Sequence, residues 1–217
     1  MTLPFILSHV DHTLLKPTMT TAQLRETVAD AARYGCASAC IPPCFVKEAV
    51  AEAAGRVRIC TVIGFPLGYQ STEVKCFETE QAVRDGADEI DMVIHIGAVK
   101  EGRYDDVLDE IRRVRGCCEG KILKVIIETC LLTDEEKIRM CDIVGRSGAD
   151  YIKTSTGIST GGATLDDIRL FAAHVPPHLR IKAAGGISSV EDAEAFLQAG
   201  ADRLGTSRLV AAAKAGM

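Results

Sequence analysis

The chain has 217 residues, of which 47% are hydrophobic and 25% charged, with a formal net charge of −5. This length is enough to bury one sizeable core, and the acidic balance gives no basic field to attract nucleic acid or an anionic membrane. No apolar run approaches the roughly 20 residues that cross a bilayer, and the first ten residues lack the basic start of a signal peptide. We therefore expect a cytoplasmic protein with no nucleic-acid or membrane partner.

Nine cysteines raise the question of disulfides and metal sites. An odd number without a secretory signal argues against a disulfide framework. Cys36, Cys40 and Cys44 recur every four residues, but they straddle a predicted strand and its loop. Cys36 and Cys40 would then lie roughly 13 Å apart, which is too far for one zinc ion. The sequence therefore predicts no metal site, and most thiols are expected to be small buried hydrophobes.

Short β-rich runs alternate with helical patterns from one end of the chain to the other. The predicted strands cover residues 9–14, 37–41, 58–65, 89–94, 122–128, 151–156, 180–184 and 203–206, and helical patterns include 21–34, 72–84, 134–146 and 189–198. A Gly-Ala-Asp junction recurs at 86–88, 148–150 and 200–202, where glycine can end a helix before the next strand. Eight such units without a linker predict a (β/α)8 TIM barrel, with 1–217 as a single catalytic domain. An open doubly wound sheet is the alternative.

Alternate residues of a strand face opposite sides of the sheet, so each predicted strand can be divided into two faces. In the fourth to seventh strands one face is uniformly apolar and suits the outer helices. The other face carries charged residues on all four strands, among them Asp91, Lys124, Glu128, Lys153 and Lys182. Charge inside a barrel is costly unless it is paired, so this face indicates either an internal ion-pair network or a catalytic site. Lysines near the carboxyl ends of the strands, where barrel active sites form, favour catalysis.

Two of these lysines, Lys153 and Lys182, lie on adjacent predicted strands. A free lysine is nearly all ammonium at neutral pH and cannot attack a carbonyl group. Burial and a neighbouring cation both favour the neutral amine, which can. This pattern predicts a lysine nucleophile, but it does not decide which of the two lysines attacks.

Glycine-containing turns follow the last three predicted strands, at 156–157 with 161–162, at 185–186 and at 205–207. The loops after strands seven and eight are the common phosphate site of this fold, and backbone amides approach an anion most closely where Cβ is absent. Each turn alone is a weak signal. Together, at one rim of the barrel, they predict a phosphate-binding site.

Five segments of the chain resemble the signature strands of the deoxyribose-phosphate aldolase family. They are VDHTLLKP at 10–17, EIDMVI at 89–94, LKVIIET at 123–129, YIKTSTG at 151–157 and IKAAGGI at 181–187. The resemblance implies a class I aldolase that reversibly cleaves 2-deoxy-D-ribose 5-phosphate to D-glyceraldehyde 3-phosphate and acetaldehyde through a lysine Schiff base. It further implies that the partners are these phosphosugar and aldehyde substrates, that no cofactor is needed, and that the chain forms a homo-oligomer, either a dimer or a tetramer.

The same resemblance implies a role for individual residues. Lys153 matches the Schiff-base lysine, Lys182 matches the second lysine that favours its neutral amine, and Asp91 matches the acid/base that moves protons through a bound water. The positions that match residues lining the substrate channel are Asp11, Cys40 and Lys124, and those that match the phosphate cradle are Gly157, Gly185, Gly186 and Ser207. Thr156 and Arg208, which adjoin these residues in the sequence, are also expected to bind substrate.

The sequence departs from the family pattern at a few positions. His95 stands just beyond Asp91, where many relatives carry another polar residue, and could retune the proton relay. Arg208 replaces the second serine of some members and could add charge to the phosphate-binding site. Ile158 stands where some members have a lysine. The terminal Ala-Lys-Ala-Gly-Met lacks the tyrosine that assists proton transfer in some members.

Two other functions are open on the residues alone. One is a phosphosugar isomerase on a similar barrel, which works by acid/base chemistry without an imine. The other is a non-enzymatic phosphosugar-binding relative, although binding alone would not need two crowded lysines beside Asp91.

Overall fold

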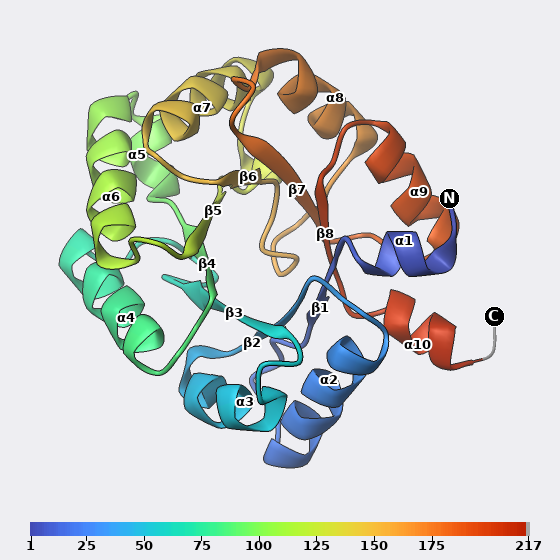
Figure 1. The fold of residues 1–217 in the computed structure, drawn as a ribbon. Coiled ribbons are helices and arrows are strands. Elements are labelled where there is room, and N and C mark those ends of the chain that lie inside the picture. Colours follow the sequence, from blue (N-terminus) through green and yellow to red (C-terminus); the bar gives the residue numbers. More distant parts are fainter. Residues whose placement is uncertain (216–217) are drawn as a thin grey trace.

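Eight parallel strands close into a barrel in the computed structural model, which describes residues 1–215 (Figure 1). The strands are β1 (Val10–Thr13), β2 (Ser38–Ile41), β3 (Arg58–Ile63), β4 (Glu89–Val93), β5 (Ile122–Ile126), β6 (Tyr151–Lys153), β7 (Arg180–Ala184) and β8 (Arg203–Thr206). Each strand pairs with the next, and β8 returns to pair with β1. The predicted TIM barrel is therefore confirmed, and the open sheet is excluded. The last two residues of the terminal Ala-Lys-Ala-Gly-Met lie outside the described residues.

Helices surround the barrel as an outer ring (Figure 1). They are α1 (Leu3–Leu7), α2 (Thr21–Arg33), α3 (Val46–Ala53), α4 (Thr72–Arg84), α5 (Ile96–Lys100), α6 (Tyr104–Cys117), α7 (Asp134–Arg146), α8 (Leu165–His174), α9 (Val190–Gln198) and α10 (Leu209–Lys214), with short 3-10 turns η1 (Pro43–Phe45) and η2 (Thr129–Leu131). Capping boxes begin α2, α7 and α9, where a hydroxyl and a side chain three residues later satisfy free backbone N–H groups. No helix within residues 1–215 is long and apolar enough to span a membrane.

The apolar faces of the strands pack outward against this ring. Ile90, Met92, Leu123 and Val125 are fully buried in one cluster with residues of α6 and α7. This arrangement confirms the division of faces in β4 and β5, and it leaves the charged face for the barrel interior.

Several strands are shorter than predicted at their carboxyl ends. The fifth ends at Ile126 and the sixth at Lys153, two and three residues early. Glu128 adopts a left-handed conformation with φ of 55°, and η2 begins directly after it. The chain therefore leaves the sheet at this rim, and the residues that follow form loops around the mouth of the barrel.

Candidate active site

A buried carboxylate, Asp91 on β4, collects three lysines inside the barrel. Lys124 Nζ donates to its Oδ1 at 2.8 Å, while Lys153 Nζ and Lys182 Nζ donate to its Oδ2 at 2.7 and 2.6 Å. The sheet register places these residues together, since Asp91 pairs with Lys124 on β5, and Lys153 on β6 pairs with Lys182 on β7. The prediction that these four side chains face the barrel interior is confirmed.

A second layer of charge lies beside this cluster. Asp11 on β1 accepts hydrogen bonds from Lys182 Nζ, from Ser38 Oγ at 2.7 Å and from Arg203 Nη1 at 2.6 Å. Glu89 joins the two layers, because it lies 2.5 Å from Lys124 Nζ and 3.2 Å from Arg203 Nη1.

Sequence reasoning missed Arg203, although the available signal was the same as for the lysines. On β8 it alternates with the core residue Leu204, so the two-residue period already places Arg203 inside. Its guanidinium also lies over the Tyr151 ring, 5.5 Å from the centroid. The eighth strand therefore supplies a further cation to the barrel interior.

The interior network contains three carboxylates and four cationic side chains. The carboxylates are Asp11, Glu89 and Asp91, and the cations are Lys124, Lys153, Lys182 and Arg203. Although burial alone would raise the pKa of Asp91, the ammonium groups of Lys124, Lys153 and Lys182 hold it well below its usual value. Burial opposes the charge on Lys182, but Asp11 and Asp91 outweigh it and raise the pKa of that lysine. Lys182 is therefore a permanent cation. Lys153 has Asp91 as its one carboxylate partner among the described residues and shares it with two other lysines.

We expect the ion pairs of Asp11 and Asp91 to make the fold sensitive to acid. The pKa of each carboxyl is lowered in the folded state, so each contributes full stability above about pH 4 to 5 and loses it as the pH falls. The urea midpoint of unfolding should hold between pH 6 and 7 and fall steadily below about pH 4. An unchanged midpoint down to pH 3 would contradict the lowered pKa values.

A cavity of about 370 Å³ opens at the carboxyl ends of β1, β6, β7 and β8. The predicted site residues that line it are Lys153, Thr156, Gly157, Gly185, Gly186, Ser207 and Arg208. Lys153 is the member of the ion network that reaches this cavity, whereas Lys182 and Asp91 are fully buried behind it. The structure also adds Lys16, an exposed cation in the cavity wall that sequence reasoning did not single out.

Two glycine turns in the cavity wall approach each other too closely for side chains. A Cβ on Gly162 would lie 2.5 Å from the carbonyl carbon of Gly185, and Gly185 itself has φ of 81°. The amide of Ala163 donates to the Ala184 and Gly185 carbonyls at 3.0 and 3.1 Å, which ties the two loops together. The predicted rim of glycine turns is therefore assembled, with the loops after β6 and β7 in direct contact.

Glu128 is buried, but it forms no ion pair with the lysines of the network among the described residues. Its Oε2 accepts a hydrogen bond from Thr156 Oγ1 at 2.5 Å, and its carboxylate also accepts from the Thr156 amide. The cause is the early end of β5, because the two-residue period no longer applies once the chain turns at Glu128. Glu128 instead anchors the cavity residue Thr156.

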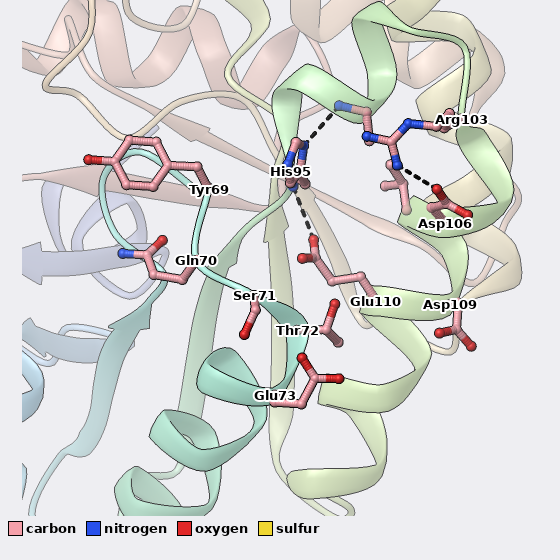
Figure 2. A pocket seen from close by; sticks show the side chains of 12 residues that line it. Tyr69, Gln70, Ser71, Thr72, Glu73, His95, Arg103, Asp106, Asp109 and Glu110 are labelled. Atoms are coloured by element: carbon pink, nitrogen blue, oxygen red, sulfur yellow. Dashed lines mark hydrogen bonds and ion pairs between the residues drawn. The ribbon is translucent and has the colours of Figure 1, made fainter.

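His95 also lies away from the carboxylate cluster. Its Nδ1 accepts from the Ala98 amide at 2.9 Å and so caps α5, and its own amide donates to Glu110 at 3.0 Å. Glu110 pairs at 2.7 Å with Lys75, which is fully buried. Figure 2 shows His95 and Glu110 in the lining of a separate cavity of about 540 Å³ between α4 and α6. The expectation that His95 retunes a relay at Asp91 is therefore wrong, because β4 ends at Val93 and His95 begins the next helix.

Cys40, Lys124 and Asp11 are buried in the barrel and do not line the cavity. Cys40 forms a small apolar cluster with Cys60 and Val62, and the cavity residue Leu15 packs against it. These three residues therefore lie behind the residues that line the cavity, whereas the resemblance implied that they line the substrate channel themselves.

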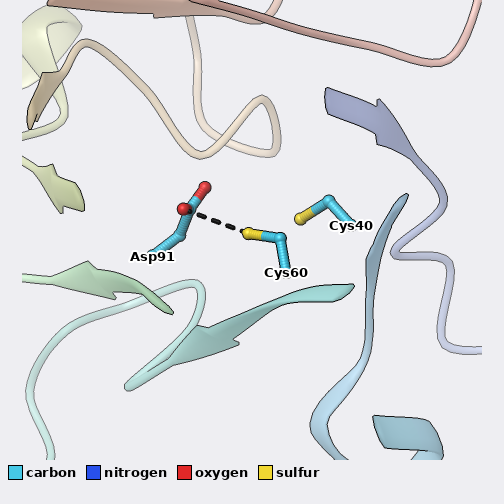
Figure 3. A group of neighbouring side chains, drawn as sticks. All are labelled: Cys40, Cys60 and Asp91. Atoms are coloured by element: carbon cyan, nitrogen blue, oxygen red, sulfur yellow. Dashed lines mark hydrogen bonds between the residues drawn. The ribbon is translucent and has the colours of Figure 1, made fainter. Parts of the chain in front are cut away.

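Two sets of buried side chains have donor atoms close enough together to hold a metal ion. They are Cys40 with Cys60 and Asp91, shown in Figure 3, and Asp11 with Cys60 and Glu89. Lys124 Nζ lies 3.3 Å from Cys60 Sγ, 2.8 Å from Asp91 and 2.5 Å from Glu89, so an ammonium group already occupies this position. A divalent cation would add charge to an interior in which cations already outnumber carboxylates. These residues therefore suit lysine better than metal.

A parallel barrel with a cavity at the carboxyl ends of its strands is the architecture of a TIM-barrel enzyme. Residues 5–217 match the DeoC/LacD family of aldolases, and the chain belongs to that family. It is therefore an aldolase, a lyase that breaks or forms a carbon–carbon bond.

Individual relatives are similar over nearly their whole length. The chain is 58% identical over 205 residues to a deoxyribose-phosphate aldolase of Clostridium botulinum, covering 94% of this chain and 93% of that one. It is 55% identical over 205 residues to the enzyme of the same name from Streptococcus pyogenes, covering 94% and 92%. The structure of a putative deoxyribose-phosphate aldolase from Coccidioides immitis superposes with a TM-score of 0.94 at 38% identity, covering 99% and 87%. A tetrameric deoxyribose phosphate aldolase from Aeropyrum pernix gives 0.89 at 33% identity, covering 100% and 94%.

Proposed function

We propose that the chain is a class I aldolase that reversibly cleaves 2-deoxy-D-ribose 5-phosphate to D-glyceraldehyde 3-phosphate and acetaldehyde, with Lys153 as the Schiff-base lysine. The observation that carries the assignment is the position of Lys153. Its side chain lines the cavity and lies 2.7 Å from Asp91, while the other lysines of the network are fully buried. Relatives at 55% to 58% identity that carry the name deoxyribose-phosphate aldolase support the choice of substrate.

The charge distribution supports Lys153 over Lys182 as the nucleophile. Lys182 bonds both Asp11 and Asp91, and these carboxylates keep it protonated. A protonated amine has no lone pair with which to attack a carbonyl. Lys153 has one carboxylate partner among the described residues, Asp91, which it shares with two other lysines. Loss of one proton from Lys153 would leave three cations balanced by three carboxylates.

Three side chains, Lys153, Asp91 and Lys182, would carry out the cleavage. The Lys153 amine adds to C1 of the open-chain sugar, and loss of water gives a protonated imine. The C3 hydroxyl loses its proton, the C2–C3 bond breaks, and its electron pair moves into the imine to form an enamine as glyceraldehyde 3-phosphate leaves. Protonation of C2 and hydrolysis of the imine release acetaldehyde. We assign the proton transfers to Asp91 through a bound water, with Lys182 as the fixed charge that favours the free amine of Lys153.

The rim of the cavity provides the phosphate end of the proposed site. Gly157, Gly185, Gly186 and Ser207 bring backbone and hydroxyl donors to the cavity wall, and Lys16 and Arg208 bring positive charge. These two cations would supply the charge that some family members place at the position of Ile158. Thr156 would contact the sugar beside Lys153, while Asp11, Cys40 and Lys124 would act from behind the wall.

We expect 2-deoxyribose without phosphate to be cleaved much less efficiently than its 5-phosphate. Each charge-assisted hydrogen bond to the phosphate contributes about 1.5–3 kcal/mol, and this remote binding also positions the reacting carbons. The test compares kcat/KM for acetaldehyde release from the two sugars, each with and without EDTA. Near-equal values would remove the phosphate site from the proposal. An isomerase would release no acetaldehyde from either sugar, and loss of activity to EDTA would contradict a metal-independent mechanism.

We further propose that residues 1–217 act as one catalytic domain and assemble as a homo-oligomer, a dimer or a tetramer. The tetrameric relative from Aeropyrum pernix supports assembly. So do four exposed large apolar side chains on and before α4, which are Leu67, Tyr69, Val74 and Phe77. Nine free thiols are consistent with action in the reducing cytoplasm.

A further inference from the structure

A buried thiol on β3, Cys60, contacts the central carboxylate. Its Sγ lies 3.2 Å from Asp91 Oδ1 (Figure 3). It also lies 3.3 Å from Lys124 Nζ, and the Cys60 side chain is fully buried. Burial raises the pKa of the Cys60 thiol well above its usual value, so the group keeps its proton and can donate it in a hydrogen bond. The Thr61 carbonyl, 3.8 Å away, and the neighbouring Cys40 thiol are uncharged and therefore weaker acceptors for this hydrogen.

The donors to Asp91 divide between its two oxygens. Oδ2 accepts from Lys153, which lines the cavity, and from the fully buried Lys182. Oδ1 accepts from Lys124 and Cys60, both fully buried. This division leaves Oδ2 as the oxygen that faces the lysine in the cavity wall.

Lys124 alone would hold Oδ1 poorly in one orientation. Its ammonium group is 2.5 Å from Glu89, closer than the 2.8 Å that separates it from Asp91. Because this lysine is shared between two carboxylates, its hold on Oδ1 is divided, and the thiol on the neighbouring strand gives Oδ1 a second donor. The register places Cys60 beside Glu89 and Val62 beside Asp91, so the thiol approaches from the adjacent strand.

We infer that Cys60 is a positioning residue that fixes the Asp91 carboxylate with Oδ2 toward Lys153. The inference rests on the proposed function, in which Asp91 transfers protons to and from the substrate attached to Lys153. Without the thiol donor, imine formation would continue, but the proton transfers that follow would slow.

Two variants separate the hydrogen bond from the space that Cys60 fills. Cys60→Ser keeps a donor of similar shape, whereas Cys60→Val keeps apolar volume and removes the donor, with Cys60→Ala as the alternative if valine does not fold. For each, we would measure how fast borohydride traps acetaldehyde on the protein, which reports imine formation. We would also measure how fast the methyl group of acetaldehyde exchanges hydrogen for deuterium in D₂O, which requires proton removal from the imine.

We expect the valine variant to lose about 3- to 10-fold in exchange rate, the effect of one net hydrogen bond, while trapping stays within about twofold of the parent. The serine variant should keep exchange within about twofold of the parent. Cys141→Ala, which removes an equally buried thiol from α7, is the matched control and should leave both rates unchanged.

The outcomes distinguish this inference from the proposed function. If the parent protein neither traps nor exchanges acetaldehyde, the proposed function fails and the inference fails with it. If the parent does both, parent-like exchange in the donor-free variant overturns the positioning role of Cys60 alone. A serine variant as slow as valine, or equal losses of trapping and exchange, would also overturn that role, because both indicate disturbed packing.

Discussion

Replacing Lys182 by glutamine is expected to slow cleavage about 10- to 100-fold at pH 7 and to restore much of the rate as the pH rises toward 9. Asp11 and Asp91 raise the pKa of Lys182, so in the native protein it is a permanent positive charge beside Lys153. Without that charge the ammonium form of Lys153 is favoured. Each 1.36 kcal/mol in favour of the ammonium form lowers the fraction of free amine tenfold at neutral pH. The measurement is kcat/KM from pH 6 to 9.5 for the parent and the variant.

A leucine variant belongs beside the glutamine variant. Leucine also removes polar surroundings from Lys153, which disfavours its ammonium form and blunts the effect. Both variants leave Asp11 and Asp91 short of a partner, so the rates should be measured well below each variant's unfolding temperature. If activity is lost at every pH in both variants, Lys182 carries a proton in the slow step and the fixed-charge role is wrong.

Replacing Asp91 by asparagine is expected to lower kcat/KM by about 10² to 10⁴, the usual contribution of a general acid/base. Imine formation should persist, because Lys153 remains in the cavity wall and loses the carboxylate that held its proton. We therefore expect the variant to trap acetaldehyde with borohydride while cleaving the sugar phosphate very slowly. The three lysines around Asp91 lose a shared partner, so the free energy of unfolding should fall by about 3–5 kcal/mol.

Asp11→Asn is the matched comparison for this effect. Asp11 is equally buried and bonds Lys182 and Arg203, but it makes no ion pair with Lys153 in the described part of the chain. We expect a similar loss of stability and a smaller loss of kcat. Equal losses of kcat in the two variants, or an Asp91→Asn protein that no longer traps acetaldehyde although folded, would contradict the role of Asp91 in proton transfer.

The barrel could be predicted because its signals are local. Each strand shows its two faces through a two-residue period, and the Gly-Ala-Asp junctions mark where helices end. The same period placed Asp91 and the three lysines inside, and pairing across neighbouring strands then brought them together. Applied to the eighth strand, it would have placed Arg203 there as well.

The site residues that could not be placed from the sequence depend on where each strand ends, and tertiary contacts decide where a strand ends. Glu128 and His95 share the strand period in the sequence, but both lie past the last residue of their strand and point to other partners. The choice between Lys153 and Lys182 has the same origin. The loops after β6 and β7 shape a cavity that Lys153 lines and Lys182 does not. The spacing of residues in the sequence does not reveal how these loops fold.

The central claim is that Lys153 forms the imine, and borohydride reduction with acetaldehyde followed by peptide mass mapping tests it most directly. We expect one ethyl group per chain, on the peptide that contains Lys153, in the presence of EDTA, and the same treatment should abolish cleavage of 2-deoxyribose 5-phosphate. Labelling on Lys182, or an unlabelled protein that still cleaves the sugar phosphate, would contradict it.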